Sequence, residues 1–462
     1  MLSESDLYPT QLAAARFLLE RDAGALFASV GTGKSVMSMT AFAAALYAGV
    51  AARALVVAPL AVAKFTWASE FRKWAHLQHL RVSLVVGTPT QRQAALEADA
   101  DLYVVNFDVL TKVLDQYPRE LPWDTLIIDE LSKLKDRSTK RWRMLSRRLG
   151  DFERRWGLTG TPSPNHLSEL WPQTFVLDRG LGERAEPPYG LGPSWTRFRS
   201  QRFTQTDWQG YTWEPKPDTA AFITDRLRPL VFRASAEDML GQKPHHEVVH
   251  EIDLPAAVVR TYRQIERDAF AQIGDSAITA VNAAIITGKL LQVTSGAVYD
   301  EDSVPVPLHT AKYEAVEDLV AELQGEPLLI VFGYQHELVE YLRRLPQAIH
   351  MTAQSPQALI DRWNANEIEV AITHSASLGH GVNLQLGGAH NLLFTTPTYS
   401  NERREQMIGR LHRQGQKNTV LVHDLAATLG GLPSIDHLVL DVLRGKHTLQ
   451  EGILRSFEET QP

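Results

Sequence analysis

Short runs of apolar residues alternate along this chain with longer stretches in which apolar residues recur at helical spacing. In the first half, the apolar runs occupy positions 26–27, 55–57, 82–86, 102–105 and 126–128. A second series occupies positions 328–332, 370–373, 392–394 and 420–422. Continuous apolar runs between helices are typical of strands buried on both faces of a parallel sheet. The pattern therefore predicts an α/β fold with two lobes, each a parallel sheet flanked by helices.

The stretch between the two series has a different composition. Residues 180–217 are rich in Gly, Pro and aromatic residues, which indicates irregular structure, whereas residues 256–293 are rich in Ala and Ile at helical spacing. We therefore expect a mostly helical, partly irregular insertion between the lobes. The expected division is a first lobe at 1–240, with the irregular insertion at about 163–240, and a second lobe at 241–462, with a helical lead-in at about 241–325.

Composition narrows the class of protein. A length of 462 residues suits about two to three domains, and 44% hydrophobic with 22% charged residues is ordinary for a globular chain. The chain has no cysteine, which excludes disulfides and cysteine-ligated zinc and fits a reducing compartment. Residues 41–63 are nearly uncharged, but Gly49, Arg53 and Pro59 interrupt them. With no secretory signal visible, we expect a cytoplasmic protein without a membrane partner.

The charge distribution leaves two interpretations open. The formal net charge of −7 argues mildly against a nucleic-acid partner, which favours a basic surface. Residues 133–148, however, hold eight Lys or Arg against one Asp. This run is either a solvated helix face or a functional basic surface.

The first candidate site is the segment 28–35, A-S-V-G-T-G-K-S, between a predicted strand and a predicted helix. Gly31, Thr32 and Gly33 would turn main-chain N–H groups toward phosphate oxygens at the N-terminus of the helix. Lys34 would contact the β- and γ-phosphates, and Ser35 would ligate Mg²⁺. The first position is Ala28 where the strict pattern has Gly. The segment predicts a site for ATP and Mg²⁺.

Two further segments suit the same chemistry. Asp129 and Glu130 follow the apolar run 126–128, so they would lie at a strand end, with Asp129 holding Mg²⁺ and Glu130 acting as the general base on water. Residues 158–162, L-T-G-T-P, offer hydroxyl groups that could hydrogen-bond to this acidic pair.

A second candidate site lies almost four hundred residues further on, at 406–416, Q-M-I-G-R-L-H-R-Q-G-Q. Arg410 and Arg413 are three residues apart, about one helical turn. A bound triphosphate needs positive charge at its γ-phosphate, and these arginines could supply it. The two sites together predict a motor whose two lobes close on ATP. The predicted catalytic residues are Lys34, Asp129, Glu130, Gln406, Arg410 and Arg413.

The order of these motifs resembles that of superfamily-two helicases. The segment G-R-L-H-R-Q-G-Q and residues 375–385, S-A-S-L-G-H-G-V-N-L-Q, are similar to the Swi/Snf-type, chromatin-remodeller-like ATPases. The short, undecorated chain is similar to bacterial and viral members, which suits a bacterial or virus-infected host cell. The chain departs from the family at Leu131-Ser132, where the branch more often has Ala-His. The resemblance covers about 7–425 and is weakest at 163–300.

The resemblance implies two recombinase-like lobes that bind ATP and double-stranded DNA. It assigns Tyr8 and Gln11 to adenine recognition, although Gln11 could also be an exposed helix residue, and it places Gly381 in a loop that couples nucleotide to DNA. The positions that it assigns to nucleic-acid contact are Pro59, Lys64, Thr161 and Ser377.

Three functions therefore remain as candidates. The first is a DNA-dependent ATPase that translocates on double-stranded DNA without separating its strands. The second is a strand-separating DNA or RNA helicase. The third is a DNA-bound scaffold with weak ATPase activity. Protein partners and the biological pathway do not follow from the residues.

Overall fold

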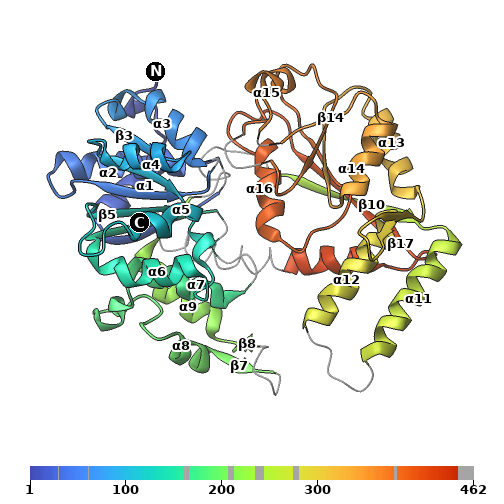
Figure 1. Cartoon of the computed structure of the whole chain (residues 1–462), viewed down its shortest axis with the longest axis horizontal. Coiled ribbons are helices and arrows are strands. Elements are labelled where there is room, and N and C mark those ends of the chain that lie inside the picture. The colour runs from blue at the N-terminus through green and yellow to red at the C-terminus, as the bar shows by residue number, and fades with distance from the viewer. Residues whose placement is uncertain are drawn as a thin grey trace. The chain divides into compact units, whose positions relative to one another are not determined.

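The computed structural model of the chain describes residues 1–29, 31–60, 62–160, 162, 166–206, 213–234, 244–273, 280–352, 354–378 and 382–445 (Figure 1). The chain divides into two compact units, Met1–Gln242 and Lys243–Lys446. The first runs from blue to light green in Figure 1 and the second from light green to red. Among the described helices, none has the length and apolar character that a bilayer crossing requires.

The core of the first unit is a seven-stranded sheet in which every pair of neighbours is parallel. The strand order is β3-β4-β2-β5-β6-β1-β9. The strands are β1 (Ala23–Ala28), β2 (Ala54–Ala58), β3 (Val82–Val85), β4 (Leu102–Asn106), β5 (Thr125–Asp129), β6 (Arg154–Thr159) and β9 (Val231–Ala234). The five apolar runs of the first series fall on these strands, except that Val86 follows the end of β3. Parallel strands end at the same edge of a sheet, so β1 and β5 bring distant residues together there.

Helices cover both faces of this sheet because alternate strand residues point to opposite sides. On one face, Val56 packs in a cluster with residues of α1 (Pro9–Leu19), α2 (Lys34–Tyr47) and α3 (Ala68–Lys73). On the other, Val57 packs with residues of α5 (Phe107–Leu114), α6 (Lys140–Arg148) and α7 (Leu170–Asp178). Helix α4 (Pro89–Glu97) contributes Leu96 to this second cluster.

The predicted insertion is largely built into the first unit. Helices α8 (Trp195–Arg202) and α9 (Thr219–Leu227) add Phe198 and Ile223 to the cluster that contains Val57, and β9 pairs with β1. A short hairpin joins β7 (Phe203–Gln205) to β8 (Trp213–Pro215). The segment therefore completes the first sheet and its core.

The second unit has a six-stranded parallel sheet in the order β10-β17-β16-β13-β15-β14. The strands are β10 (His246–Asp253), β13 (Leu328–Phe332), β14 (Ile349–His350), β15 (Val370–His374), β16 (Asn391–Phe394) and β17 (Leu421–Thr428). Its helices are α11 (Ala256–Ile273), α12 (Ala280–Thr294), α13 (Ala311–Glu322), α14 (Gln335–Arg344), α15 (Gln357–Asn364) and α16 (Asn401–Leu411). A hairpin pairs β11 (Ala297–Tyr299) with β12 (Pro305–Pro307). The predicted α/β architecture with two parallel sheets is confirmed.

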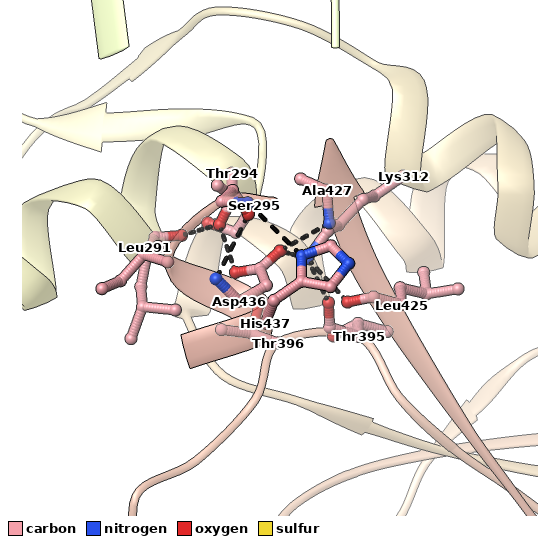
Figure 2. Close-up of polar contacts among 12 residues, drawn as sticks. Leu291, Thr294, Ser295, Lys312, Thr395, Thr396, Leu425, Ala427, Asp436 and His437 are labelled. Carbon is pink, nitrogen blue, oxygen red and sulfur yellow. Dashed lines mark hydrogen bonds and ion pairs between the residues drawn. The ribbon is translucent and has the colours of Figure 1, made fainter. Parts of the chain in front are cut away.

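A buried ion pair ties the last described helix, residues 435–445, to this sheet (Figure 2). The Nζ atom of Lys312 lies 2.7 Å from Oδ2 of Asp436, and the two side chains are 1% and 0% exposed. Lys312 also donates to the main-chain oxygens of Thr395, at 3.0 Å, and Leu425, at 3.1 Å. The Thr294 hydroxyl donates to Asp436 Oδ1 at 2.7 Å. Both buried charges are thus hydrogen-bonded within the chain.

Candidate functional site

The loop between β1 and α2 forms a closed turn. Gly31 and Gly33 have φ angles of 86° and 84°, a conformation that suits glycine. A Cβ atom on Gly33 would also lie 2.6 Å from Nε2 of Gln11. Lys34 is the first residue of α2, and its Nζ donates to the main-chain oxygens of Ala28 at 2.7 Å and Ser29 at 3.0 Å. The loop therefore leads into the N-terminus of a 14-residue helix with an ammonium group folded back across it.

Gln11 joins the N-terminal helix to this loop. Its side chain is only 4% exposed, which excludes the alternative of an exposed helix residue. Its Nε2 donates to the main-chain oxygen of Thr32 at 2.9 Å, and its Oε1 accepts from the N–H of Tyr8 at 2.9 Å. Thr32 is itself anchored, since its hydroxyl donates to the oxygen of Ser29 at 2.8 Å. Tyr8 and Gln11 thus lie beside the phosphate-type loop.

Asp129 is the last residue of β5 and is buried, with 8% of its surface exposed. The indole Nε1 of Trp67 donates to its Oδ2 at 2.7 Å. Burial, and to a smaller extent the charge of Glu130, raise the pKa of Asp129, which is about 6 in the folded chain. Hydrogen bonds from Trp67 and Ser35 and the charge of Lys34 act in the opposite direction. Lys34, Ser35, Asp129 and Glu130, which are separated by up to 96 positions in sequence, therefore belong to one electrostatic cluster.

Glu130 begins the turn after β5 with a φ angle of 76°, which is uncommon for a residue other than glycine. Its Oε1 accepts from the hydroxyls of Ser132, at 2.7 Å, and Thr159, at 2.8 Å. The predicted contact between the L-T-G-T-P segment and the acidic pair is confirmed through Thr159. Among the described residues, no hydrogen bond reaches Oε2 of Glu130, so this oxygen has capacity to accept a proton.

The donor set fits a triphosphate with a divalent cation. Two adjacent carboxylates lie near Lys34, and burial, with a smaller contribution from the charge of Glu130, raises the pKa of Asp129. Hard oxygen ligands of this kind suit Mg²⁺, which binds through one or two carboxylates together with substrate phosphates. Ser35 and Asp129 are the residues that would hold it.

In the second unit, the structure separates the two arginines of the 406–416 motif. Helix α16 ends at Leu411 and the following residue, His412, is not helical, so Arg413 lies beyond the helix rather than one turn after Arg410. Arg410 is 3% exposed, and its Nη1 donates to the oxygen of Val382 at 3.3 Å. Burial lowers the pKa of Arg410, and the charge of Arg413 lowers it further.

Arg413 and Gln406 are more accessible than Arg410. Both are partly exposed. Arg413 donates from Nη1 to Oδ1 of Asn383 at 2.6 Å, and Gln406 donates to Glu402 at 3.3 Å on the same helix. Arg413 is therefore the arginine of this motif whose side chain a ligand can reach.

The candidate nucleic-acid residues are spread over both units. Pro59 follows β2 and is partly exposed, and Lys64 is exposed on the short π-helix Val62–Trp67. Ser377 is partly exposed in a turn after β15, where its N–H donates to the oxygen of His374. Thr161 and Gly381 lie outside the described residues.

Two side chains of the site were not predicted. Trp67 contacts Asp129 across 62 positions, and nothing in the sequence around it distinguishes it from a core tryptophan. Ser132 occupies a position noted only as a departure from the family, yet its hydroxyl contacts Glu130. Both show that the acidic pair is oriented by donors that lie outside the recognised motifs.

Comparisons with known proteins give one family model and several relatives. The model of the SNF2-related domain matches residues 10–293. The putative protein p41 of Acyrthosiphon pisum secondary endosymbiont phage 1 is 32% identical, over 97% of this chain and 98% of that protein. A CHD3-type chromatin-remodeling factor of Arabidopsis thaliana is 23% identical over 92% of this chain, which spans 35% of that protein. The solved Sulfolobus solfataricus SWI2/SNF2 ATPase core in complex with dsDNA is similar over 98% of this chain and 95% of that chain, at 20% identity and a TM-score of 0.46.

Proposed function

The chain belongs to the SNF2-related family of helicase-like ATPases, and on that premise we propose that it is a DNA-dependent ATPase that translocates along double-stranded DNA. The observation that carries the proposal is the cluster at the carboxyl edge of the first sheet. There the loop residues Lys34 and Ser35 act electrostatically on Asp129, and Glu130 is oriented by two hydroxyl groups.

Each residue of this cluster has a role in phosphoryl transfer to water. The glycine loop and the N-terminus of α2 bind phosphate oxygens through main-chain N–H groups. Lys34 exchanges its contacts with Ala28 and Ser29 for phosphate oxygens. Glu130 takes a proton from the attacking water at Oε2 while Oε1 stays held by Ser132 and Thr159. When bound, Mg²⁺ neutralises charge on the β- and γ-phosphates.

We assign the second source of positive charge to Arg413. The family motif offers Gln406, Arg410 and Arg413, and of the two arginines only Arg413 is partly exposed. Arg410, which is buried behind the loop residue Val382, positions this segment instead. In phosphoryl-transfer enzymes, an arginine of this kind stabilises charge on the transferring group.

Double-stranded DNA is the proposed polymer on two grounds. The motif segments 375–385 and 409–416 resemble the Swi/Snf branch, whose members usually translocate without strand separation. The similar Arabidopsis thaliana protein is named as a chromatin-remodeling factor. We propose Pro59, Lys64, Thr161 and Ser377 as contacts to the DNA, and Tyr8, Gln11 and Gly381 as contacts that recognise or sense the nucleotide.

An ATPase assay under four conditions tests the proposal: without nucleic acid, with duplex DNA, with single-stranded DNA and with RNA. We expect duplex DNA to give the largest stimulation and a strand-displacement assay on the same duplex to show no unwinding. Equal stimulation by any polyanion would refute the proposed substrate, and strand displacement would favour a helicase. Turnover that is absent under all four conditions would favour a scaffold.

A further inference from the structure

A groove outside the nucleotide cluster runs between α5 and α6 in the first unit. It has a volume of about 540 Å³. Leu114 at the end of α5, Pro118 in the following turn and Met144 of α6 provide its apolar lining. The remaining lining is polar and mostly cationic. The concave shape and mixed lining are typical of a surface that takes a ligand with both charged and apolar parts.

Three cations line the groove from one side of α6. They are Lys140, Arg143 and Arg147, at positions i, i+3 and i+7 of a helix whose opposite face buries Trp142 and Leu145. All three cationic residues are exposed. Since a helix rises about 1.5 Å per residue, the outer two are about 10.5 Å apart along its axis. Three of the eight cations in the run 133–148 thus form a row along α6 that faces a groove.

In the part of the chain that the structure describes, no carboxylate forms a direct ion pair with these three side chains. Among the residues that the structure describes, none of the three side chains makes an ion pair or a hydrogen bond. Of the three, Arg143 acts with Arg137 on Asp136, whose pKa is lowered first by hydrogen bonds from Ser138. Arg148, which also lines the groove, differs because it is paired with Asp151 at 2.6 Å. The row therefore presents excess positive charge on a chain whose net charge is −7.

The total length of the row, rather than the interval between its charges, suits several successive phosphates of one nucleic-acid strand. Phosphates follow one another at about 3.4 Å along the axis of one strand, so three steps cover about 10 Å, close to the length of the row. The apolar wall of Leu114, Pro118 and Met144 suits the sugar faces between phosphates. Asp115 on that wall is a single negative charge against three positive ones. We propose that the α5–α6 groove binds the phosphate backbone of the DNA on which the enzyme acts, an inference that rests on the proposed function.

The second unit provides a matched control. Helix α11 carries Arg260, Arg263 and Arg267 at the same i, i+3 and i+7 spacing, and all three are exposed. Arg267 donates to Gln264 at 2.9 Å and to the oxygen of Arg263 at 3.2 Å. Changing either row to alanine makes the net charge three units more negative, so the two triple variants are matched in charge and lose it in different units. The hydrogen bonds of Arg267 are lost only in the α11 variant.

Duplex DNA binding at a series of salt concentrations tests the inference on the full chain. Each phosphate contact contributes about 0.9 to the slope of log affinity against log salt. We expect K140A/R143A/R147A to lower that slope by about 2.7 relative to the unchanged protein, and R260A/R263A/R267A to leave it unchanged. K140R/R143K/R147K keeps the charges and should keep the slope.

The outcomes separate this inference from the proposed function. If the unchanged protein binds no duplex at low salt, the proposed DNA partner itself is wrong. If it binds duplex but the α6 and α11 triple variants have the same slope, the groove does not contact DNA and the proposed function stands. An α6 variant that binds duplex normally but loses binding to a polyglutamate peptide retained by the unchanged protein would assign the groove to an acidic protein segment and refute our inference.

Discussion

Each unit contains a lysine that donates to two main-chain oxygens, and the two lysines differ in their burial and in their carboxylate neighbours. Lys312 is 1% exposed and is saturated by two main-chain oxygens and the carboxylate of Asp436 (Figure 2). Lys34 rests on two main-chain oxygens but stays partly exposed, and the nearby Asp129 has a raised pKa because it is buried next to another carboxylate. Lys312 and Asp436 thus form a buried pair of opposite charges, whereas Asp129 is buried beside a second carboxylate and Lys34 stays accessible.

This difference separates a structural from a functional use of the same side chains. A buried ion pair whose atoms are all hydrogen-bonded holds together the helix and strands that carry it. Removing one partner leaves the other as an unpaired buried charge. A site with uncompensated charge and strained backbone, such as Glu130 with its positive φ, is less stable than it could be and marks a place where binding supplies the missing interactions.

The largest effect that we predict tests whether the first unit's site is chemically complete without the second unit. Replacing Arg413 with alanine should lower turnover by about 10³- to 10⁵-fold, the contribution typical of an arginine that acts on the transferring phosphate. Nucleotide affinity should change little. Steady-state ATPase rates and equilibrium binding of a fluorescent nucleotide measure the two effects. Lys417→Ala, which removes an exposed cation four residues away, serves as the control. Near-normal turnover in Arg413→Ala would mean that Lys34 and its neighbours suffice.

The next largest effect concerns Glu130, the carboxylate that we propose as the general base for the attacking water. Glu130→Gln keeps an oxygen that can accept from Ser132 and Thr159 but cannot take a proton. Turnover should fall by about 10²- to 10⁴-fold, as expected for a lost general base, with nucleotide binding retained. Loss of binding together with a lower unfolding temperature would instead make Glu130 a structural residue like Asp436.

Substitutions in the ion pair of the second unit should change the free energy of unfolding of the protein. Lys312→Met leaves Asp436 buried and unpaired, so the free energy of unfolding should drop by about 3–5 kcal/mol, measured by urea denaturation. Adding Asp436→Leu should recover part of that loss, because no unpaired buried charge then remains, while the hydrogen bonds from Thr294 and the Ala427 N–H to Asp436 stay lost. Lys34→Met should lose nucleotide binding with a much smaller loss of stability. If both lysine variants lose equal stability, the contrast between the two sites is wrong.

The sequence predicts most of the fold because buried parallel strands carry continuous apolar runs. Charged residues break the apolar pattern in two strands that the apolar runs did not predict, β6 and β10. Strand β6 begins R-R-W-G, and its buried Arg155 is accepted in the core only because its guanidinium donates to the oxygens of Leu177, Leu149 and Phe152. Strand β10 reads H-E-V-V-H-E-I-D and is an edge strand, so its polar residues remain partly or fully exposed. Whether a charged residue such as Arg155 can be buried depends on main-chain oxygens elsewhere in the fold. The residues next to it in the sequence do not show where those oxygens lie.

The same limit applies to the site. Lys34, Ser35, Asp129 and Glu130 were predicted because phosphate chemistry requires these residue types at strand ends. The expected helical turn between Arg410 and Arg413 was wrong, because α16 ends at Leu411. A spacing of three residues is compatible with a helix, but whether the helix continues depends on the packing of residues that follow.

The smallest effect tests how the chain restrains the charge on Asp129. Trp67→Phe removes the hydrogen bond to Oδ2 and keeps a buried aromatic ring. That bond favours the ionised carboxylate, so its loss should raise the pKa of Asp129 above about 6. A hydrogen bond to a charged group is worth about 1.5–3 kcal/mol, and 1.36 kcal/mol corresponds to one pKa unit, so we expect a rise of about one to two units.

Because protons and Mg²⁺ compete for the ionised carboxylate, the affinity for Mg²⁺-nucleotide should decline below about pH 6 in the unchanged protein and begin to decline one to two pH units higher in Trp67→Phe. Trp142→Phe is the control, since the indole of Trp142 donates to the oxygen of Pro172 and no carboxylate. Identical pH profiles for the unchanged protein and Trp67→Phe would show that Trp67 only fills space, and that the raised pKa of Asp129 is governed by burial and Glu130 alone.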